Sequence, residues 1–329
     1  MKRPIAYLAG VGKYAPPRVM KNAEFAALGL ETDDEWIVQR TGIRERHVAA
    51  PDETNRTMAA AASRVAMERV GVTAGELDLI VLGTASPDRL LPSTAVDVQA
   101  ELGATRAAAF DVMAACSSFL YGLIVAEGLM QAGSAETALV IGTEKLTTIV
   151  DWKDRSTCVL FGDGSGAAVL KKSDGTKGIL SSFMRTDGRL AELLYRPAGG
   201  AAHPFDQRVL DDRSFYVKME GREVFKHAVR SMSEAADHAL DGAKLTGAEI
   251  DVMIPHQANI RIIEATAKHA GIPMDKVYVN VDRYGNTSSA SVPIALEEAL
   301  ASGRIKEGMN VLLVAFGAGF TWASLVIRF

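Results

Sequence analysis

The stretch Ala107–Gly122, AAAFDVMAACSSFLYG, determines how the rest of this 329-residue chain is interpreted. Its first half is short and apolar and ends in small residues, as a buried strand does. From Phe119 onward apolar residues recur every three or four positions, which predicts a helix. Cys116 therefore lies where a strand turns into a helix, and unpaired backbone N–H groups there favour a thiolate. The alternative is a buried cysteine that acts as a small hydrophobic residue.

The composition is that of a globular protein and excludes several classes of function. Hydrophobic residues make up 48% of the chain, and the formal net charge is −4. Neither nucleic acid nor a membrane is therefore expected as a partner. The two cysteines have no CxxC spacing, so we expect neither a disulfide framework nor a metal site. No apolar run approaches the roughly 20 residues that a bilayer span needs, and we expect a cytoplasmic protein.

The second half of the chain repeats the order of the first. A long predicted helix leads to VTAGELD (Val72–Asp78) and a short apolar strand. Another long predicted helix leads to LTGAEID (Leu245–Asp251) and another strand, with the two threonines 173 positions apart. Strands alternate with helices in both halves, which predicts an α/β fold with two sheets covered by helices. We place one unit at residues 1–174 and the other at 175–329.

Candidate site residues follow the predicted strands. Ligands of open α/β sheets bind beyond the carboxyl ends of the strands. In the second half, strands are predicted at Val252–Ile254, Tyr278–Val281 and Val311–Phe316, and they are followed by His256, Asn286 and Gly317–Gly319. The segment Thr157–Leu170 is expected to form two strands around a glycine-rich turn.

Cysteine, histidine and asparagine together suit thioester chemistry. A thiolate attacks an acyl carbonyl and leaves again easily. Neutral His256 and Asn286 can both donate hydrogen bonds to an enolate, which an aspartate would repel, and loss of CO2 from a malonyl group makes such an enolate without a general base. The backbone N–H groups of Cys116 and Ala318 are expected to form an oxyanion hole. Taken singly, His256 is equally well a structural histidine, and Asn286 a turn residue after Gly285.

These residues belong to motifs that resemble β-ketoacyl-acyl-carrier-protein synthase III, the initiating condensing enzyme of type II fatty-acid synthesis in the thiolase-like superfamily. The resemblance implies a duplicated thiolase-like fold, layered αβαβα, with two central mixed sheets. The motifs occur in family order along nearly the whole chain: Asp34–Ile37 (DEWI), Arg40–Arg46 (RTGIRER), Asp111–Cys116 (DVMAAC), Phe161–Ala167 (FGDGSGA), Ile254–Asn259 (IPHQAN), Tyr284–Ser291 (YGNTSSAS) and Phe316–Trp322 (FGAGFTW).

The resemblance assigns roles to individual residues. It implies a catalytic triad of Cys116, His256 and Asn286. No bound cofactor is implied, because the coenzyme A thioester is a substrate. Trp36 and Arg155 would enclose its adenine through stacking and cation–π contacts. Further residues implied to contact coenzyme A are Arg40 at the pyrophosphate and Asn259 near the pantetheine arm. The alternatives are a core aromatic for Trp36 and solvated surface positions for the arginines.

The partners implied are an acyl-CoA, a malonyl-acyl-carrier protein and a second copy of the chain. In the implied homodimer, strand Thr137–Ile141 pairs with its two-fold copy, and Leu91 reaches from one subunit to close the acyl pocket of the other. Acetyl-preferring members of the family have phenylalanine at the position of Leu91. After the cysteine the family commonly has smaller residues, such as alanine and glycine, so Ser117 and Ser118 are expected to alter the pocket floor. An acidic carrier protein would meet a basic patch on the predicted helix Phe225–Leu240 and its neighbour: Arg222, Lys226, Arg230, Arg261 and Lys268.

Three other readings remain. A relative from specialised, polyketide-type metabolism would use the same acyl-cysteine for priming or for acyl transfer without decarboxylation. A catalytically dead scaffold subunit would usually lack the nucleophile. A thiolase proper would carry a second cysteine near Gly317–Gly319, where this chain has none. The residues favour the first of these readings as the runner-up.

Overall fold

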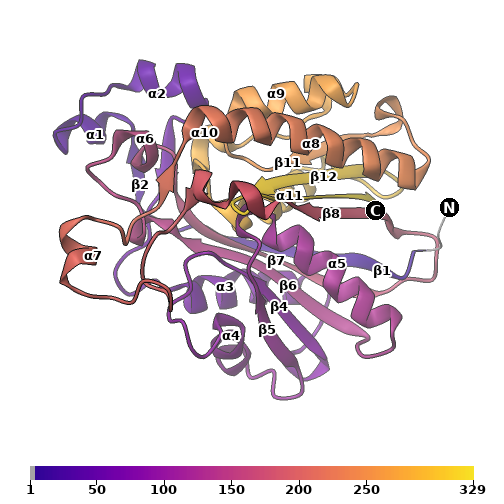
Figure 1. The fold of residues 1–329 in the computed structure, drawn as a ribbon. Coiled ribbons are helices and arrows are strands. Elements are labelled where there is room, and N and C mark those ends of the chain that lie inside the picture. Colours follow the sequence, from indigo (N-terminus) through magenta and orange to yellow (C-terminus); the bar gives the residue numbers. More distant parts are fainter. Residues whose placement is uncertain (1–3) are drawn as a thin grey trace.

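The computed structural model describes residues 4–329, which form two mixed β-sheets stacked in layers with helices (Figure 1). The first sheet has the order β1-β7-β6-β4-β5, and the second has the order β11-β12-β13-β8. The strands of the first sheet are β1 (Ala6–Tyr14), β4 (Leu79–Gly83), β5 (Ala108–Val112), β6 (Thr137–Lys145) and β7 (Asp163–Lys172). Those of the second sheet are β8 (Gly178–Thr186), β11 (Val252–Pro255), β12 (Asn310–Gly317) and β13 (Thr321–Arg328).

Helices occupy three layers around these sheets. The outer layers are α3 (Asn55–Glu68) with α4 (Thr94–Leu102), and α8 (Gly221–Ala243) with α9 (Ile260–His269). Between the sheets lie α5 (Ser118–Gln131) and α11 (Ser291–Ala301), each of which contacts strands of both sheets. Smaller elements are α1 (Ala23–Ala27), α2 (Asp34–Thr41), α6 (Arg155–Cys158), α7 (Gln207–Asp211), α10 (Val281–Tyr284) and the pairs β2 (Val19–Lys21) with β3 (Glu45–His47) and β9 (Leu194–Tyr195) with β10 (Lys218–Met219). The predicted αβαβα layering is therefore confirmed.

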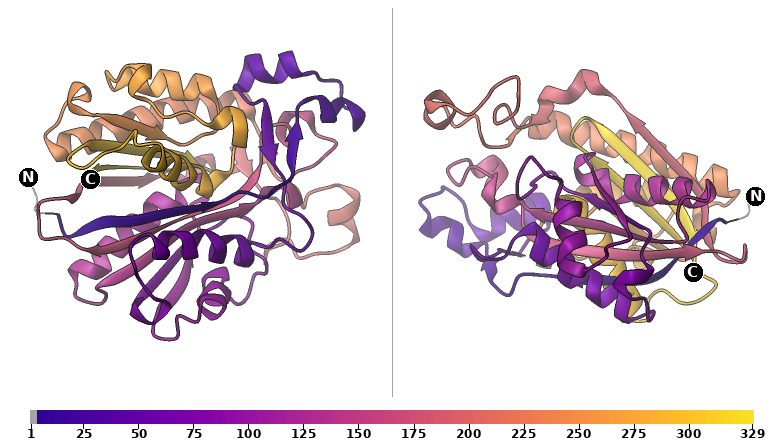
Figure 2. Two further views of the ribbon diagram at one scale, coloured as in Figure 1. Left: turned by 180° about the vertical axis from the view of Figure 1, so that it is seen from behind. Right: turned by 90° about the horizontal axis from the view of Figure 1, so that it is seen from below.

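Alternating apolar residues along single strands hold the layers together. On β4, Val81 packs into the middle layer with α5, whereas Ile80 and Leu82 pack into the outer layer with α3 and α4. Strands with apolar residues on both faces are those of a sheet covered on both sides. Seen from behind, β1 crosses the molecule between the N-terminal helices and the C-terminal half (Figure 2).

The two halves have matching topologies. In each, a parallel pair (β4–β6, β11–β12) is followed by two antiparallel pairings, β6–β7 and β7–β1 in one half and β12–β13 and β13–β8 in the other. The same capping box, Thr73 with Glu76 and Thr246 with Glu249, precedes the first strand of each parallel pair. The chain passes between the sheets from Lys172 to Gly178. We propose that residues 1–174 and 175–329 are the two copies of one unit.

The glycine-rich segment is not the predicted turn. Arg155–Cys158 is helical, and β7 runs continuously through the glycines. They are needed because α11 lies directly on β7. A Cβ atom at Gly166 would come within 2.7 Å of Pro293, so the glycines permit close packing rather than chain reversal.

The strand predicted at Tyr278–Val281 is also wrong. Only one β-bridge forms there, between Val277 and Met253. The side-chain oxygen of Gln257 accepts the backbone N–H groups of Asn280 (2.9 Å) and Val281 (3.2 Å), which a strand would need for its ladder. These bonds start α10 instead.

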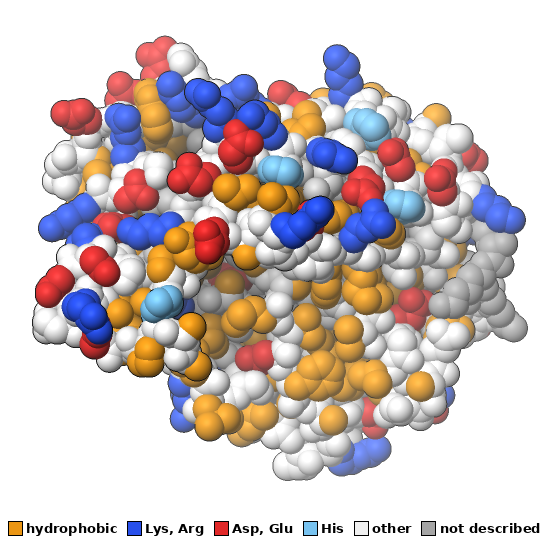
Figure 3. Space-filling view, viewed as in Figure 1, with side chains coloured by type: hydrophobic (Ala, Val, Ile, Leu, Met, Phe, Trp, Pro, Cys, Tyr) orange, Lys and Arg blue, Asp and Glu red, His pale blue; other side chains and the backbone are white. Residues whose placement is uncertain are grey.

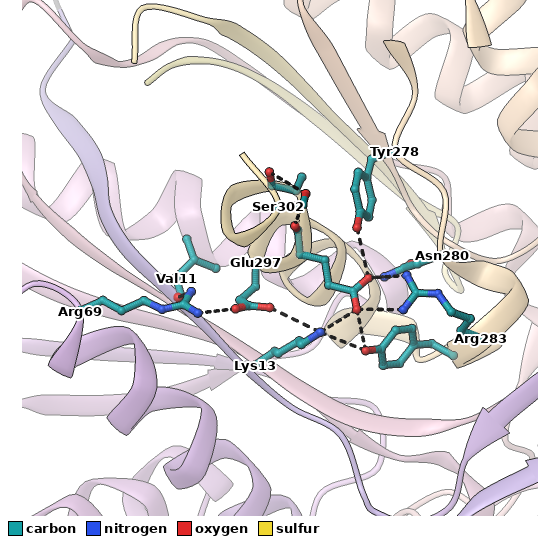
Figure 4. Close-up of polar contacts among 11 residues, drawn as sticks. Val11, Lys13, Arg69, Tyr278, Asn280, Arg283, Glu297 and Ser302 are labelled. Atoms are coloured by element: carbon teal, nitrogen blue, oxygen red, sulfur yellow. Dashed lines mark hydrogen bonds and ion pairs between the residues drawn. The ribbon is translucent and has the colours of Figure 1, made fainter. Parts of the chain in front are cut away.

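A cluster of charges around two buried glutamates joins the two halves next to α10 (Figure 4). Lys13 of β1 donates to the carboxylate of Glu298 at 2.6 Å, and Arg283 donates to it at 2.7 Å. Arg69, which follows α3, pairs with Glu297 at 2.5 Å. Burial alone would raise the pKa of Glu298, but the hydrogen bonds from Arg283 and Lys13 outweigh it and lower the pKa to about 2. Glu298 is therefore ionised in the folded protein.

Candidate active site

Cys116 lies in a single 3₁₀ turn, Ala115–Ser117, between β5 and α5. Ser118 accepts the backbone N–H of Ala114 at 2.8 Å, and Ser117 donates to the backbone oxygen of Thr321 at 3.1 Å. Both serines are fully buried and line neither cavity at Cys116. The expectation that they alter the pocket floor is therefore wrong, because they fix the cysteine turn to its neighbours.

The structure brings the three predicted triad residues to one cavity. Cys116, His256 and Asn286 line a space of about 120 Å³ between the two halves. Their exposed fractions are 8%, 4% and 7%, so bulk water is largely excluded. The strand-end rule thus locates the site, although the strand expected before Asn286 is absent.

The electrostatic state of the cysteine differs from the sequence-based expectation. Burial raises the pKa of the Cys116 thiol, and the nearby Glu144 carboxylate raises it further. A hydrogen bond from Ser288 lowers the pKa by less than burial raises it, so that the resulting pKa is about 12. The prediction of a resting thiolate is wrong, because desolvation outweighs the helix terminus. Cys116 is a thiol at neutral pH.

His256 follows β11 and is held by its backbone N–H, which donates to Val314 at 2.8 Å. Its Nδ1 lies 2.6 Å from the hydroxyl of Ser291. Burial lowers the pKa of His256 to about 3, so the ring is neutral at physiological pH, as the proposed hydrogen-bond donor requires.

Asn286 stands two residues beyond α10. Its backbone N–H donates to Leu160 at 2.8 Å, and its Oδ1 accepts the backbone N–H of Ser288 at 2.8 Å. The amide oxygen is therefore engaged, which leaves the NH₂ group of Asn286 available to a ligand in the cavity.

The turn between β12 and β13 closes against the cysteine. A Cβ atom at Gly317 would lie 2.6 Å from the backbone nitrogen of Cys116, so only glycine permits this approach. The hydroxyl of Thr321 donates to Ala114 at 2.7 Å and ties the turn to the cysteine loop. Ala318, the second predicted oxyanion-hole residue, lines a larger cavity together with Cys116.

That larger cavity measures about 740 Å³ and also reaches Cys116. Apolar side chains provide much of its lining, among them Leu90, Met113, Leu146, Ile149, Leu194, Phe205, Phe215 and Val217. Leu91 does not line this chain's own cavity, and its exposed fraction is 87%. Cys116 thus borders both the small cavity that holds His256 and Asn286 and the larger one.

The residues expected to bind coenzyme A gather around Trp36. The guanidinium carbons of Arg40 and Arg155 lie 4.3 and 4.6 Å from the centre of its ring. Both guanidinium groups thus lie within cation–π distance of Trp36. Asn259 lines the small cavity, but its side chain also caps α9 through Arg261 and donates to the backbone oxygen of Arg40 at 2.9 Å.

The predicted basic patch is exposed on α8 and α9, and Figure 3 shows Lys and Arg side chains over these helices, mixed with acidic ones. Lys226 pairs with Glu223 at 2.7 Å, and Arg261 lies 5.2 Å from the centre of the Phe225 ring. Arg222, Arg230 and Lys268 are also exposed. All five residues are therefore accessible to a partner, although part of the charge of Lys226 is already neutralised.

Two negative findings concern the described residues alone. In residues 4–329, no group of three or more His, Cys, Asp or Glu side chains is arranged to hold a metal ion. In the same range, no helix is long and apolar enough to cross a membrane.

Sequence reasoning missed the polar residues that support the site. Ser291 contacts His256, and Ser288 hydrogen-bonds Cys116. Glu144 is fully buried behind them, where Ser86 donates to it at 2.6 Å. The motif containing both serines was recognised, but only the fold shows which of its hydroxyls face the site.

Comparison with known proteins agrees with this geometry. Models of 3-oxoacyl-[acyl-carrier-protein] synthase III match residues 110–188, and models of its C-terminal part match residues 240–329. The β-ketoacyl-[acyl-carrier-protein] synthase III of Xanthomonas campestris pv. campestris is 50% identical over 328 residues, which cover 100% of this chain and 99% of the relative.

Two solved structures extend the likeness to the fold. The 3-oxoacyl-[acyl-carrier-protein] synthase III of Aquifex aeolicus VF5 superposes with a TM-score of 0.91 and 45% identity, over 98% of this chain and 100% of that one. The priming β-ketosynthase of the R1128 polyketide biosynthetic pathway has a TM-score of 0.91 and 37% identity, over 99% and 96% of the two chains.

By its duplicated, layered fold the chain is a thiolase-like enzyme. The 50% sequence identity to the Xanthomonas campestris synthase III, over the full length of the chain, identifies the family within this class. The chain belongs to the β-ketoacyl-acyl-carrier-protein synthase III family of acyltransferases.

Proposed function

We propose that the chain condenses an acyl-CoA with malonyl-acyl-carrier protein and so initiates fatty-acid synthesis. The products are a 3-oxoacyl-carrier protein, coenzyme A and CO2. The observation that carries the proposal is the meeting of Cys116, His256 and Asn286 in one cavity, with Cys116 also bordering a second, larger cavity. The chain is proposed to act in the cytoplasm.

In the first half-reaction, Cys116 takes the acyl group. Its sulfur attacks the thioester carbon and expels coenzyme A, and the proton lost by the cysteine thiol ends on the departing thiol. The backbone N–H groups of Cys116 and Ala318 are proposed to stabilise the oxyanion. Because the resting thiol is protonated, the helix terminus and Ser288 act on the developing thiolate rather than on the resting group.

In the second half-reaction, the malonyl group loses CO2 and leaves an enolate. Neutral His256 and the NH₂ group of Asn286 are proposed to donate hydrogen bonds to its oxygen. The enolate carbon attacks the acyl-cysteine thioester, and the cysteine leaves as a thiolate that regains a proton from solvent.

The proposed substrate contacts follow from the same geometry. Trp36, Arg40 and Arg155 are proposed to hold the nucleotide end of coenzyme A, and Asn259 its pantetheine arm. The exposed basic residues of α8 and α9 are proposed to meet an acidic carrier protein. Charge reversal at Lys226 and Arg261 should raise the KM for malonyl-carrier protein more than that for acyl-CoA, and equal rises would contradict this assignment.

We further propose a homodimer, with a correction to the strand that forms it. Strand Thr137–Ile141 belongs to β6, whose two edges are already paired with β4 and β7. It cannot pair with a second copy. The edge strand β5 is open on one side, and hydrophobic side chains gather over the region of β5 and α5 (Figure 3).

The loop around Leu91 supports the dimer proposal. Leu90 and Leu91 are 78% and 87% exposed, and Met113 beyond β5 is 70% exposed. Exposed apolar clusters of this kind are typical of protein interfaces. In the proposed dimer, Leu91 of each subunit closes the apolar cavity of the other.

A second function is favoured by the likeness to the R1128 priming β-ketosynthase. In that case the same acyl-cysteine would prime a specialised pathway. The deciding experiment incubates the enzyme with a panel of acyl-CoAs, measures the intact mass, and then adds malonyl-carrier protein. Acylation of Cys116 followed by 3-oxoacyl-carrier protein supports decarboxylative condensation, and analysis of the products separates initiation of fatty-acid synthesis from specialised priming. Acylation without release of CO2 would contradict condensation and favour simple acyl transfer.

A further inference from the structure

Among residues 4–329, the imidazole of His256 hydrogen-bonds one polar side chain, that of the first residue of α11. The Nδ1 atom lies 2.6 Å from Oγ of Ser291. Both residues are almost completely buried, with exposed fractions of 4% and 2%. Bulk water is therefore largely excluded, and the surrounding protein groups determine which of these two atoms carries the proton of their hydrogen bond.

The hydrogen-bond capacity of Ser291 determines which atom donates. The backbone N–H of Gln257 donates to the same Oγ at 3.4 Å. The oxygen thus already accepts one bond, and within residues 4–329 the only acceptor that hydrogen-bonds its own proton is Nδ1. If Nδ1 carried the proton instead, the buried hydroxyl would have no acceptor, which is costly in an apolar interior.

We propose that Ser291 is a positioning residue that fixes the tautomer of His256. Its hydroxyl donates to Nδ1, so the single proton of the neutral ring is on Nε2. Burial keeps the ring uncharged, and Nε2–H is then a permanent donor for the enolate oxygen. This inference rests on the proposed role of His256 in the condensation step.

The same tautomer has a consequence for the first half-reaction. A ring that carries its proton on Nε2 has no free lone pair facing the cavity. His256 therefore does not accept the proton of Cys116, and acyl transfer from acyl-CoA does not depend on Ser291. The two half-reactions should separate in a variant without the hydroxyl.

The test compares Ser291→Ala with Ser291→Thr, which keeps a hydroxyl. The control is Ser302→Ala at the C-cap of the same helix, where among the described residues the hydroxyl bonds only the helix carbonyls of Glu298 and Ala299. Acylation by acyl-CoA is followed by intact mass, and condensation by CO2 release from the acyl-enzyme. Nitrogen NMR of histidine-labelled protein reports the tautomer, with His256→Ala identifying the signal.

Ser291→Ala is expected to slow condensation roughly tenfold and to keep the acylation rate within about twofold of the wild-type rate. The nitrogen NMR signal of His256 in this variant should no longer show the Nε2–H tautomer alone. Ser291→Thr should retain the Nε2–H tautomer, and Ser302→Ala should behave as the wild type. An unchanged tautomer or an unchanged condensation rate in Ser291→Ala overturns the inference. Equal loss of both half-reactions overturns it as well, because it indicates a merely structural serine. If the wild type acylates but releases no CO2, the proposed function itself has failed.

Discussion

Replacing Glu298 by glutamine is expected to destabilise the protein by about 3 kcal/mol at neutral pH, because the pKa of this carboxyl falls from 4.5 to about 2 on folding. The carboxylate accepts from Lys13, Arg283, Asn280 and Tyr284 and is only 9% exposed. Its charge therefore holds β1 of one half to the segment that leads to Asn286 in the other.

The sign of the pH dependence follows from the depressed pKa. Because the folded protein binds this proton less readily than the unfolded chain does, the stabilisation is complete well above pH 4.5. It is lost as the pH falls towards 2. Urea unfolding of the wild type and Glu298→Gln, at one protein concentration, should show a difference of about 3 kcal/mol at pH 7 that shrinks steadily below pH 4.5.

The matched control is Tyr284→Phe, which removes a neutral donor to the same carboxylate. It should cost about 1 kcal/mol with little change between pH 7 and pH 5. A loss in Glu298→Gln that is as large at pH 3 as at pH 7 would refute the charge argument and leave only a packing defect.

Three further predictions concern the site. Iodoacetamide should modify Cys116 before Cys158, because Cys116 lines two cavities whereas Cys158 lines neither and is 1% exposed. This difference in access should outweigh the lower pKa of Cys158, about 11 against about 12 for Cys116, and the rate at Cys116 should rise about tenfold per pH unit between pH 7 and 9. Peptide mass spectrometry that finds Cys158 modified first would contradict this. Arg155→Ala should raise the KM for acyl-CoA roughly fivefold through the lost cation–π contact, and steady-state kinetics should show no change for malonyl-carrier protein. Leu91→Phe should reduce the use of longer and branched acyl-CoAs several-fold while sparing acetyl-CoA, and an unchanged acyl-CoA profile would disprove a role for Leu91 in the pocket.

Local patterns were enough to locate the elements that carry the site. Apolar periodicity identified the helix after Cys116, and the strand-end rule placed His256 correctly, because both depend on neighbouring residues alone. The role of the glycines in β7 cannot be predicted locally, because it depends on an element distant in the sequence. Helix α11 approaches β7 so closely that a side chain at Gly166 would meet Pro293.

The electrostatics of the site could not be derived from sequence order. A helix terminus argues for an acidic thiol at Cys116, but the opposing desolvation depends on packing from both halves. The same holds for Gln257, whose side chain turns the expected strand before Asn286 into α10. Contacts of this kind join residues that are far apart in the chain, and no periodic pattern in the sequence predicts them.

The most direct test of the central claim is a single-turnover comparison of Asn286→Asp with the wild type. Each enzyme is first acylated with acyl-CoA, checked by intact mass, and then mixed with malonyl-carrier protein. We predict that Asn286→Asp forms the acyl-cysteine normally but releases CO2 about 100-fold more slowly, because a carboxylate repels the enolate that the amide stabilises. Condensation at the wild-type rate would contradict the assignment of Asn286 and, with it, the proposed mechanism.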